Sequence, residues 1–347
     1  MMTVAMLFND LGHRVHVVTQ NVGLEIDLFL NKGIVVDSII NRTLTIPLIG
    51  KLANWYKFKM HIKRSIKTMP YDTLYWITGA DTLILLSESF IKNNEVVFQL
   101  NELNDELPLY QKLSRKKMQL CKKVVVPEMN RSYIAQVMYD LKRKPFVLPN
   151  KPYEFARIIQ NTPKEVQKYI DIIEEKKKSG KIVFIYQGFI SMLRDMTQIS
   201  KFVNSHNDKC CLVLMGQDEG ALKYYKEICP DIIHVPFITA PWHLIVTSHC
   251  HIGILVYLPV SLNNIYCAPN KIWEYSKFGL AMVGNDIPGL LFFNELKIGC
   301  TIDIKNESDI ENKLSNLLNE IENIKQNSLA FYDSMDMQLL LRAIIED

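Results

Sequence analysis

Short apolar runs alternate with helix-like stretches through residues 181–283, and this alternation constrains the fold more than any other feature. The runs lie at Lys181–Tyr186, Cys210–Met215, Ile252–Leu258 and Leu280–Val283. Runs of this length and composition are typical of strands buried on both faces of a sheet. Because parallel strands are joined by crossovers, usually helices, the pattern predicts an α/β domain built on a parallel sheet.

The crossover at Ala268–Gly279 carries signals for both ends of a short helix. Pro269 fits the first turn, where a missing N–H costs nothing, and Gly279 fits a left-handed stop. Ligands of open α/β sheets bind beyond the carboxyl ends of the strands. The sequence therefore predicts a helix whose start lies close to a ligand site.

Three polar side chains of this helix, Asn270, Lys271 and Glu274, have the spacing that places them on one face. An ammonium suits a phosphate, a carboxylate accepts hydrogen bonds from sugar hydroxyls, and a helix N-terminus favours anions. Together the three residues could hold both ends of a sugar nucleotide. The alternative is a capped amphipathic helix with a surface Lys–Glu pair, and this segment alone does not decide between them.

A second candidate loop follows the run at 181–186. Gly188 would let a phosphate approach the backbone, and Arg194 could bind it bidentately. The alternative for Arg194 is an ordinary surface charge.

The bulk properties indicate a two-domain protein. The chain has 347 residues, 48% of them apolar, and seven cysteines without a Cys-x-x-Cys pair. An odd number of cysteines in apolar surroundings favours reduced, buried thiols in a cytosolic protein. The sequence contains no apolar run long enough for a membrane span and no signal-peptide pattern. It also lacks a Ser-His-Asp triad, a Walker loop, a Gly-x-Gly-x-x-Gly fingerprint and a metal cluster, which argues against hydrolases, NTPases and dehydrogenases.

Positive charge is concentrated in the first half of the chain. Residues 1–150 hold 20 Lys and Arg against 13 Asp and Glu, whereas the rest holds 20 against 24. The stretch 51–67 has six basic residues, no acidic residue and three aromatic residues, and 112–123 is a second basic cluster. Both could contact an anionic membrane surface, and solvated helix edges are the alternative. No nucleic-acid recognition motif accompanies them, so we expect no nucleic-acid partner.

Several motifs resemble glycosyltransferase family 4. The run Pro269-Asn270-Lys271-x-x-Glu274-Tyr275, with Asp286-x-Pro288-Gly289 after it, resembles the donor-site segment of these retaining sugar transferases. Three further segments match in the right order, namely Gly12–Thr19, Pro149-Asn150 and Gly188 to Arg194. The sequence departs from the family pattern at Tyr266, where an earlier glutamate would stand, and at Phe189, where a basic residue would follow the glycine.

The resemblance implies a GT-B fold, an α/β architecture of two Rossmann-like domains that face each other across a cleft. We expect an acceptor-side domain at 1–150, linker helices at 151–180, a nucleotide-sugar domain at 181–330, and a C-terminal helix at 331–347 that packs toward the first domain. Relatives begin with a strand and a Gly-rich loop that have no counterpart here. We therefore expect an incomplete first domain, with a gap beneath its core where a central strand would lie.

The resemblance also assigns roles to single residues. Glu274 would bind the nucleotide ribose, and Arg194 would act on the donor diphosphate as a catalytic residue. Gly188, Asn263, Asn264, Pro269, Asn270 and Lys271 would complete the donor site, with the two asparagines contributing backbone amides. Glu102, after the expected strand 95–100, matches an acceptor-side catalytic glutamate, although Asn101 stands where relatives have histidine. No metal and no cofactor are expected.

The predicted function is transfer of a hexose-type sugar from a nucleotide sugar to a glycan or lipid-linked glycan in cell-surface polysaccharide synthesis. The predicted location is the cytoplasm, peripheral to the inner face of the cell membrane. Two alternatives stay open: a GT-B nucleotide-sugar epimerase, and an inactive GT-B remnant or binding subunit.

Overall fold

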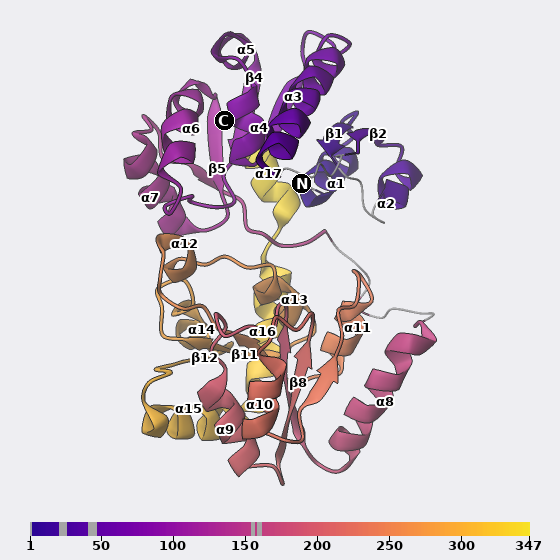
Figure 1. Ribbon diagram of the computed structural model, residues 1–347, viewed down its shortest axis with the longest axis vertical. Coiled ribbons are helices and arrows are strands. Elements are labelled where there is room, and N and C mark those ends of the chain that lie inside the picture. The colour runs from indigo at the N-terminus through magenta and orange to yellow at the C-terminus, as the bar shows by residue number, and fades with distance from the viewer. Residues whose placement is uncertain (1, 21–25, 41–46, 154–156, 158–161) are drawn as a thin grey trace. The chain divides into compact units, whose positions relative to one another are not determined.

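The computed structural model describes residues 2–20, 26–40, 47–153, 157 and 162–347 (Figure 1). The chain divides into two compact units, one formed by Met1–Pro149 with Met337–Asp347 and the other by Asn150–Asp336. Each unit is an α/β structure built around parallel strands. The predicted α/β class is therefore confirmed.

The second unit contains a six-stranded parallel sheet. Its strands are β7 (Ile182–Gln187), β8 (Cys210–Met215), β9 (Ile233–Val235), β10 (Ile252–Leu255), β11 (Ala281–Asn285) and β12 (Gly299–Ile302), in the order β12-β11-β10-β7-β8-β9. From β7 the chain builds outward through β8 and β9, and then returns to add β10 on the other side. The strand order therefore reverses between β7 and β10, which is where open α/β sheets have their ligand crevice.

Helices cover both faces of this sheet (Figure 1). Strand side chains alternate between the faces, so Val183 and Ile185 pack into one core while Phe184 and Tyr186 pack into the other. The first core takes side chains from α8 (Lys164–Lys178), α11 (His243–Ser248), α13 (Lys271–Lys277), α14 (Phe292–Glu295) and α16 (Ile321–Ser334). The second takes them from α9 (Thr197–Ser205), α10 (Leu222–Ile228) and α15 (Glu307–Asn319). One further short helix, α12 (Leu262–Ile265), precedes α13.

Some elements differ from the sequence prediction. The sequence pattern did not indicate β12, because this strand is short and begins with glycine at the edge of the sheet. The C-terminal helix expected at 331–347 is interrupted at Met335-Asp336, where α16 ends in extended backbone before α17 begins. Residues 240–242 form a turn, and α11 begins after them. The first half of the helix pair expected at 155–179 falls mainly on residues outside the described ones.

The first unit contains two parallel sheets. β1 (His16–Gln20) pairs with β2 (Val35–Ile39), and a four-stranded sheet has the order β3 (Leu74–Thr78), β4 (Glu95–Gln99), β5 (Lys123–Val126), β6 (Phe146–Val147). The helices of this unit are α1 (Met2–Asp10), α2 (Ile26–Asn31), α3 (Pro47–Ile66), α4 (Ala80–Leu85), α5 (Glu88–Asn93), α6 (Pro108–Leu120), α7 (Met129–Tyr139) and α17 (Met337–Glu346).

A cavity of about 1360 Å³ lies in the first unit, lined by residues of β1, β3, α1, α3 and α17. Among the described residues, β1 and β3 each pair with a single neighbouring strand, so each has one edge without a strand partner. The Nε2 atom of His16, in β1, is buried without a hydrogen-bond partner. Residues of both strands line the cavity, and the expected incompleteness of this unit stays a prediction.

The C-terminal helix α17 is held within the first unit by a lysine at its end. Lys123 Nζ donates hydrogen bonds to the carbonyl oxygens of Ile344 at 2.7 Å and Ile345 at 3.2 Å. A cation at a helix C-terminus satisfies carbonyl groups that have no partner inside the helix. In the part of the chain that the structure describes, no helix is both long enough and apolar enough to span a membrane.

Candidate functional site

Two glycine loops come close together at the carboxyl ends of β7 and β8. Gly188 has φ +135° and Gly216 has φ +146°, values that side-chain-bearing residues rarely adopt. A Cβ on Gly216 would lie 1.9 Å from the carbonyl oxygen of Gly188. The backbones can approach this closely only because Gly216 has no side chain. Gly188 therefore lies, at the end of β7, beside the point where the strand order reverses, and we call its backbone and the neighbouring Gly216 loop the phosphate surface.

Lys271, the first residue of α13, extends its amine over this surface. A Cβ on Gly188 would lie 3.0 Å from Lys271 Nζ, which in turn lies 5.1 Å from the ring centroid of Tyr186. Burial, followed by repulsion from Arg194, lowers the pKa of Lys271 to about 8. Lys271 is therefore a desolvated cation that a bound anion would stabilise.

Arg194 supplies a second cation from the loop after β7. Its guanidinium lies 4.2 Å from the ring centroid of Tyr257, and Nη1 donates to the carbonyl oxygen of Val256 at 3.4 Å. Both partners follow β10, so the side chain reaches across the point where the strand order reverses. Within the described part of the chain, neither Arg194 nor Lys271 forms an ion pair with a carboxylate. Two cations that lack a carboxylate partner, each beside an aromatic ring, suit a phosphate or diphosphate group.

Glu274 lies one turn after Lys271 and is held by a hydrogen-bonded chain of side chains. Gln187 Nε2 donates to Glu274 Oε2, and Thr247 Oγ1 donates to Gln187 Oε1 at 2.7 Å. Thr247 is fully buried, Gln187 is 5% exposed, and the Glu274 side chain is 14% exposed. His243 Nε2 lies 3.9 Å from Glu274 Oε1. The carboxylate therefore has one oxygen anchored by an amide and the other beside an imidazole.

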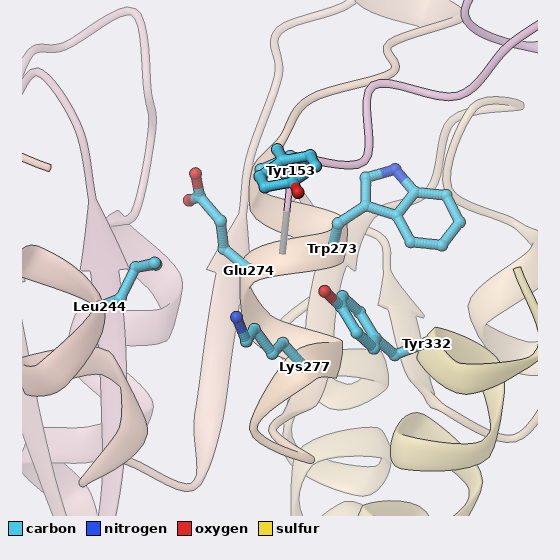
Figure 2. Close-up of a pocket in the computed structure, with 7 residues that line it drawn as sticks. Tyr153, Leu244, Trp273, Glu274, Lys277 and Tyr332 are labelled. Carbon is cyan, nitrogen blue, oxygen red and sulfur yellow. The ribbon is translucent and has the colours of Figure 1, made fainter. Parts of the chain in front are cut away.

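Glu274 also lines a small pocket with residues of its own unit (Figure 2). Figure 2 shows its carboxylate near Tyr153, with Lys277 one turn further along α13 and Leu244 facing it from α11. Trp273 stacks on Phe331 with ring centroids 4.9 Å apart. The pocket volume is about 10 Å³, which matches a single water molecule. This pocket is therefore too small for a sugar nucleotide.

Four predicted donor-site residues are brought together by the fold. The sequence spacing of Lys271 and Glu274 places both side chains against consecutive residues, Gly188 and Gln187, at the end of β7. Arg194 approaches the same region from the loop. Gly279 has φ +73°, so the predicted left-handed helix stop is confirmed.

The start of α13 differs from the prediction. Asn270 is the N-terminal cap, and its carbonyl oxygen accepts from the N–H groups of Trp273 and Glu274 at 2.9 Å and 3.0 Å. Pro269 lies before this cap and not in the first turn, because its carbonyl oxygen accepts only the longer bond from Ile272 at 3.3 Å. Asn270 is exposed, and its side chain makes no capping hydrogen bond.

The segment that contains Asn263 and Asn264 is a short helix, and contact of their backbone amides with the donor stays a prediction. Residues 262–265 form α12, and the N–H of Asn264 already donates to the Ser261 side chain at 3.2 Å and to its carbonyl oxygen at 3.1 Å. Asn263 lies in the same short helix. A loop was expected here because the sequence pattern did not identify Ser261 as a helix cap.

Glu102 lies in the first unit, exposed in the segment that follows β4. The backbone carbonyl of Glu102 accepts from Asn104 Nδ2 at 3.0 Å, and Oδ1 of the preceding Asn101 is buried without a hydrogen-bond partner. Glu102 is thus at the carboxyl end of a strand, as expected, and its catalytic role stays a prediction.

Sequence reasoning did not identify Gln187, Thr247 or His243 as site residues. Gln187 ends a buried strand, whereas His243 and Thr247 lie on a helix to which the sequence assigned no ligand contact. The only available signal was polarity, since a glutamine and a threonine sit in otherwise apolar segments. Such residues usually satisfy buried backbone groups, so the pattern alone could not indicate which partners they bind.

No protein-family model matches this sequence, and no curated protein sequence matches it. Solved structures do match. Anabaena Alr3699/HepE in complex with UDP and glucose is 14% identical with a TM-score of 0.70, and the match covers 99% of this chain and 94% of that chain. A glycosyltransferase from Rickettsia africae ESF-5 is 13% identical with a TM-score of 0.66, and the match covers 99% and 92%.

A third match is a trehalose-6-phosphate synthase from work on enzymatic glycosyltransfer with retention. It is 12% identical with a TM-score of 0.64, and the match covers 96% of this chain and 98% of that chain. At these identities the similarity concerns the fold, and it extends over nearly the whole chain. The predicted fold is confirmed: this chain has the GT-B fold of these solved glycosyltransferases.

Proposed function

We propose that this protein is a retaining glycosyltransferase that uses a nucleotide sugar, with a UDP-sugar as donor. The observation that carries the proposal is the convergence of Arg194 and Lys271 on the Gly188 backbone, with the Glu274 carboxylate one helical turn away. A nucleotide sugar offers a diphosphate to the cations and a ribose diol to the carboxylate. HepE, which was also solved in complex with UDP-glucose, supports this choice of donor.

In the proposed mechanism, the bond between the anomeric carbon and the β-phosphate oxygen breaks and negative charge accumulates on the departing UDP. Arg194 and Lys271 stabilise that charge, and they do so more strongly than they would in water because Lys271 is desolvated. The acceptor hydroxyl forms the new bond on the same face of the sugar and transfers its proton to the departing β-phosphate oxygen. Glu102 is proposed to act on the acceptor side, supported only by its place after β4.

A nucleotide binding panel tests the donor site. UDP at about 100 times its dissociation constant should add about 2.7 kcal/mol to the free energy of unfolding, which would raise the melting temperature by several degrees. We expect this shift with one nucleotide class, and we expect Glu274→Ala to reduce it strongly because the ribose hydroxyls lose their acceptor.

The matched control is Glu165→Ala, an exposed glutamate in the first turn of α8. UDP should raise the melting temperature of this variant as much as it raises that of the wild type. An unchanged shift in Glu274→Ala would remove Glu274 from the donor site. Donor turnover with a changed sugar configuration but no transfer to an acceptor would favour the epimerase, and no binding in a folded sample would favour the inactive remnant.

The proposed acceptor is a glycan or lipid-linked glycan at the inner face of the cell membrane, in cell-surface polysaccharide synthesis. Support comes from a basic surface in the first unit, defined as the exposed residues Lys57, Lys63 and Arg64 of α3 with Lys112 and Arg115 of α6. The two helices meet where Lys51 Nζ of α3 donates to the Tyr110 hydroxyl of α6 at 3.0 Å. Exposed apolar side chains lie on the same helices, at Leu52, Tyr56, Leu109 and Leu113.

We expect binding to vesicles that contain phosphatidylserine and little binding to phosphatidylcholine vesicles. Each basic residue near an anionic surface contributes about 1 kcal/mol, so neutralising Lys63, Arg64, Lys112 and Arg115 to Gln should weaken partitioning by roughly a hundredfold or more. A sedimentation assay measures this. The control neutralises four exposed lysines of the second unit: Lys164, Lys178, Lys223 and Lys226. An equal loss in both variants would contradict a specific membrane face.

A further inference from the structure

The Glu274 carboxylate is connected to the interior of the second unit by two buried polar side chains from different elements. Thr247 comes from α11, Gln187 from the end of β7, and Glu274 from α13. We propose that Thr247 and Gln187 are positioning residues, which fix the Glu274 carboxylate in the orientation that accepts the ribose hydroxyls of the donor nucleotide. This inference rests on the proposed function.

The direction of this chain follows from which groups can donate. An ionised carboxylate only accepts hydrogen bonds, so Gln187 must turn its NH₂ group toward Glu274 and its carbonyl oxygen toward Thr247. The flipped amide would place two acceptor oxygens against each other at Glu274. The Thr247 hydroxyl stabilises this orientation of the Gln187 amide by donating to its carbonyl oxygen, and the amide in turn holds the rotamer of Glu274.

The Thr247 hydroxyl has two possible acceptors, and its hydrogen bond to one of them supports the Gln187 amide. Its Oγ1 lies 2.7 Å from Gln187 Oε1 and 3.1 Å from the carbonyl oxygen of His243, and one hydroxyl proton can serve only one of them. The shorter distance favours Gln187. In the absence of this hydroxyl, the amide can rotate, and a carboxylate that has lost its anchor can turn toward His243, whose Nε2 is 3.9 Å from Oε1.

The hydrogen bond from Gln187 leaves other acceptor positions of the Glu274 carboxylate free to bind a diol. Gln187 occupies one position on Oε2, so Oε1 and the remaining lone pairs of Oε2 are available to two adjacent hydroxyls. A carboxylate already fixed in position loses less side-chain entropy when the ligand binds. The two buried residues should therefore affect affinity for the ribose hydroxyls and leave contacts to the diphosphate unchanged.

The test compares two probes, UDP and 2′,3′-dideoxyuridine diphosphate, by isothermal titration calorimetry on the full chain. Wild type should bind UDP more tightly than the dideoxy compound. Thr247→Val keeps the size and branching of the side chain and removes only the hydroxyl. We expect it to weaken UDP binding by about tenfold and to leave binding of the dideoxy probe unchanged, so that discrimination falls by the same factor.

Two further variants separate positioning from a general structural effect. Thr247→Ser restores the hydroxyl and should restore discrimination, whereas Gln187→Met fills the same space without hydrogen bonds and should lose it. If Thr247→Val keeps the wild-type ratio, or loses affinity equally for both probes, the inference is overturned.

Glu274→Ala distinguishes this failure from failure of the proposed function. If Glu274→Ala no longer distinguishes UDP from the dideoxy probe but Thr247→Val still does, the ribose contact of Glu274 is supported and the positioning role of Thr247 is wrong. If Glu274→Ala keeps discrimination, or wild type does not bind UDP, the proposed ribose contact is wrong and this inference is overturned with it.

Discussion

Lys271→Met is expected to lower the affinity for UDP by about a hundredfold while leaving the weak affinity for uridine unchanged. Truncating one partner of a desolvated charge pair typically costs 2–5 kcal/mol, and about 2.7 kcal/mol is a hundredfold. Methionine keeps the long apolar stem beside Tyr186, so the loss reports the ammonium group and its contact with the diphosphate. Calorimetric titration with UDP and with uridine measures both quantities.

The pH dependence of the same interaction provides a second readout. In the free protein the pKa of Lys271 is lowered to about 8, first by burial and then by Arg194, with Glu274 acting in the opposite direction. A bound diphosphate favours the protonated lysine and raises its pKa. Affinity for UDP is therefore complete below about pH 8 and falls as the pH rises above it.

Lys271→Met is the control for the pH dependence of UDP affinity, because it has no ammonium group to titrate. Lys271→Met should show a flat affinity across pH 7.5–9.5, and Lys223→Met, at an exposed site on α10, should behave as wild type does. A wild-type affinity that does not change over this range would contradict the assignment of Lys271 to the phosphate site.

Gly216→Ala is expected to destabilise the second unit by about 4 kcal/mol. Its Cβ would lie 1.9 Å from the carbonyl oxygen of Gly188, and its φ of +146° is almost exclusive to glycine. The backbone strain alone costs about 1–3 kcal/mol, and relieving the clash requires the two loops after β7 and β8 to separate. Because Gly188 is part of the proposed phosphate surface, UDP binding should also be lost. Chemical denaturation measures the first effect and calorimetry the second.

Gly220→Ala is the matched control for this variant. Gly220 also has a positive φ, +94°, but a Cβ there would meet nothing within 4 Å. It should therefore show only the conformational penalty of about 1 kcal/mol and should bind UDP normally. If the two variants lose equal stability, the close contact between the loops is not a source of strain.

Local sequence signals located most strands of the second unit. β8 coincides with the predicted run, and β7 and β11 differ from their predictions by one or two residues at the ends. β7, β8 and β11 are buried along almost their whole length, so their sequences are nearly continuous apolar runs. The edge strand β12 has only two buried residues and was missed. The first unit followed the same rule, since its buried strand β4 was predicted within one residue at each end.

The sequence alone determined that Gly188, Arg194, Lys271 and Glu274 belong to one region, because parallel strands deliver their following loops to one edge of the sheet. Only the tertiary structure decided which side chains those residues meet. The orientation of Glu274 depends on Gln187, which is 87 residues away along the chain, and on Thr247, which is 60 residues from Gln187. Likewise, the lowered pKa of Lys271 arises from burial against Tyr186 and from the proximity of Arg194. Periodicity and capping signals describe neighbours along the chain, whereas hydrogen-bond partners and desolvation arise from packing between elements that the chain brings together only when it folds.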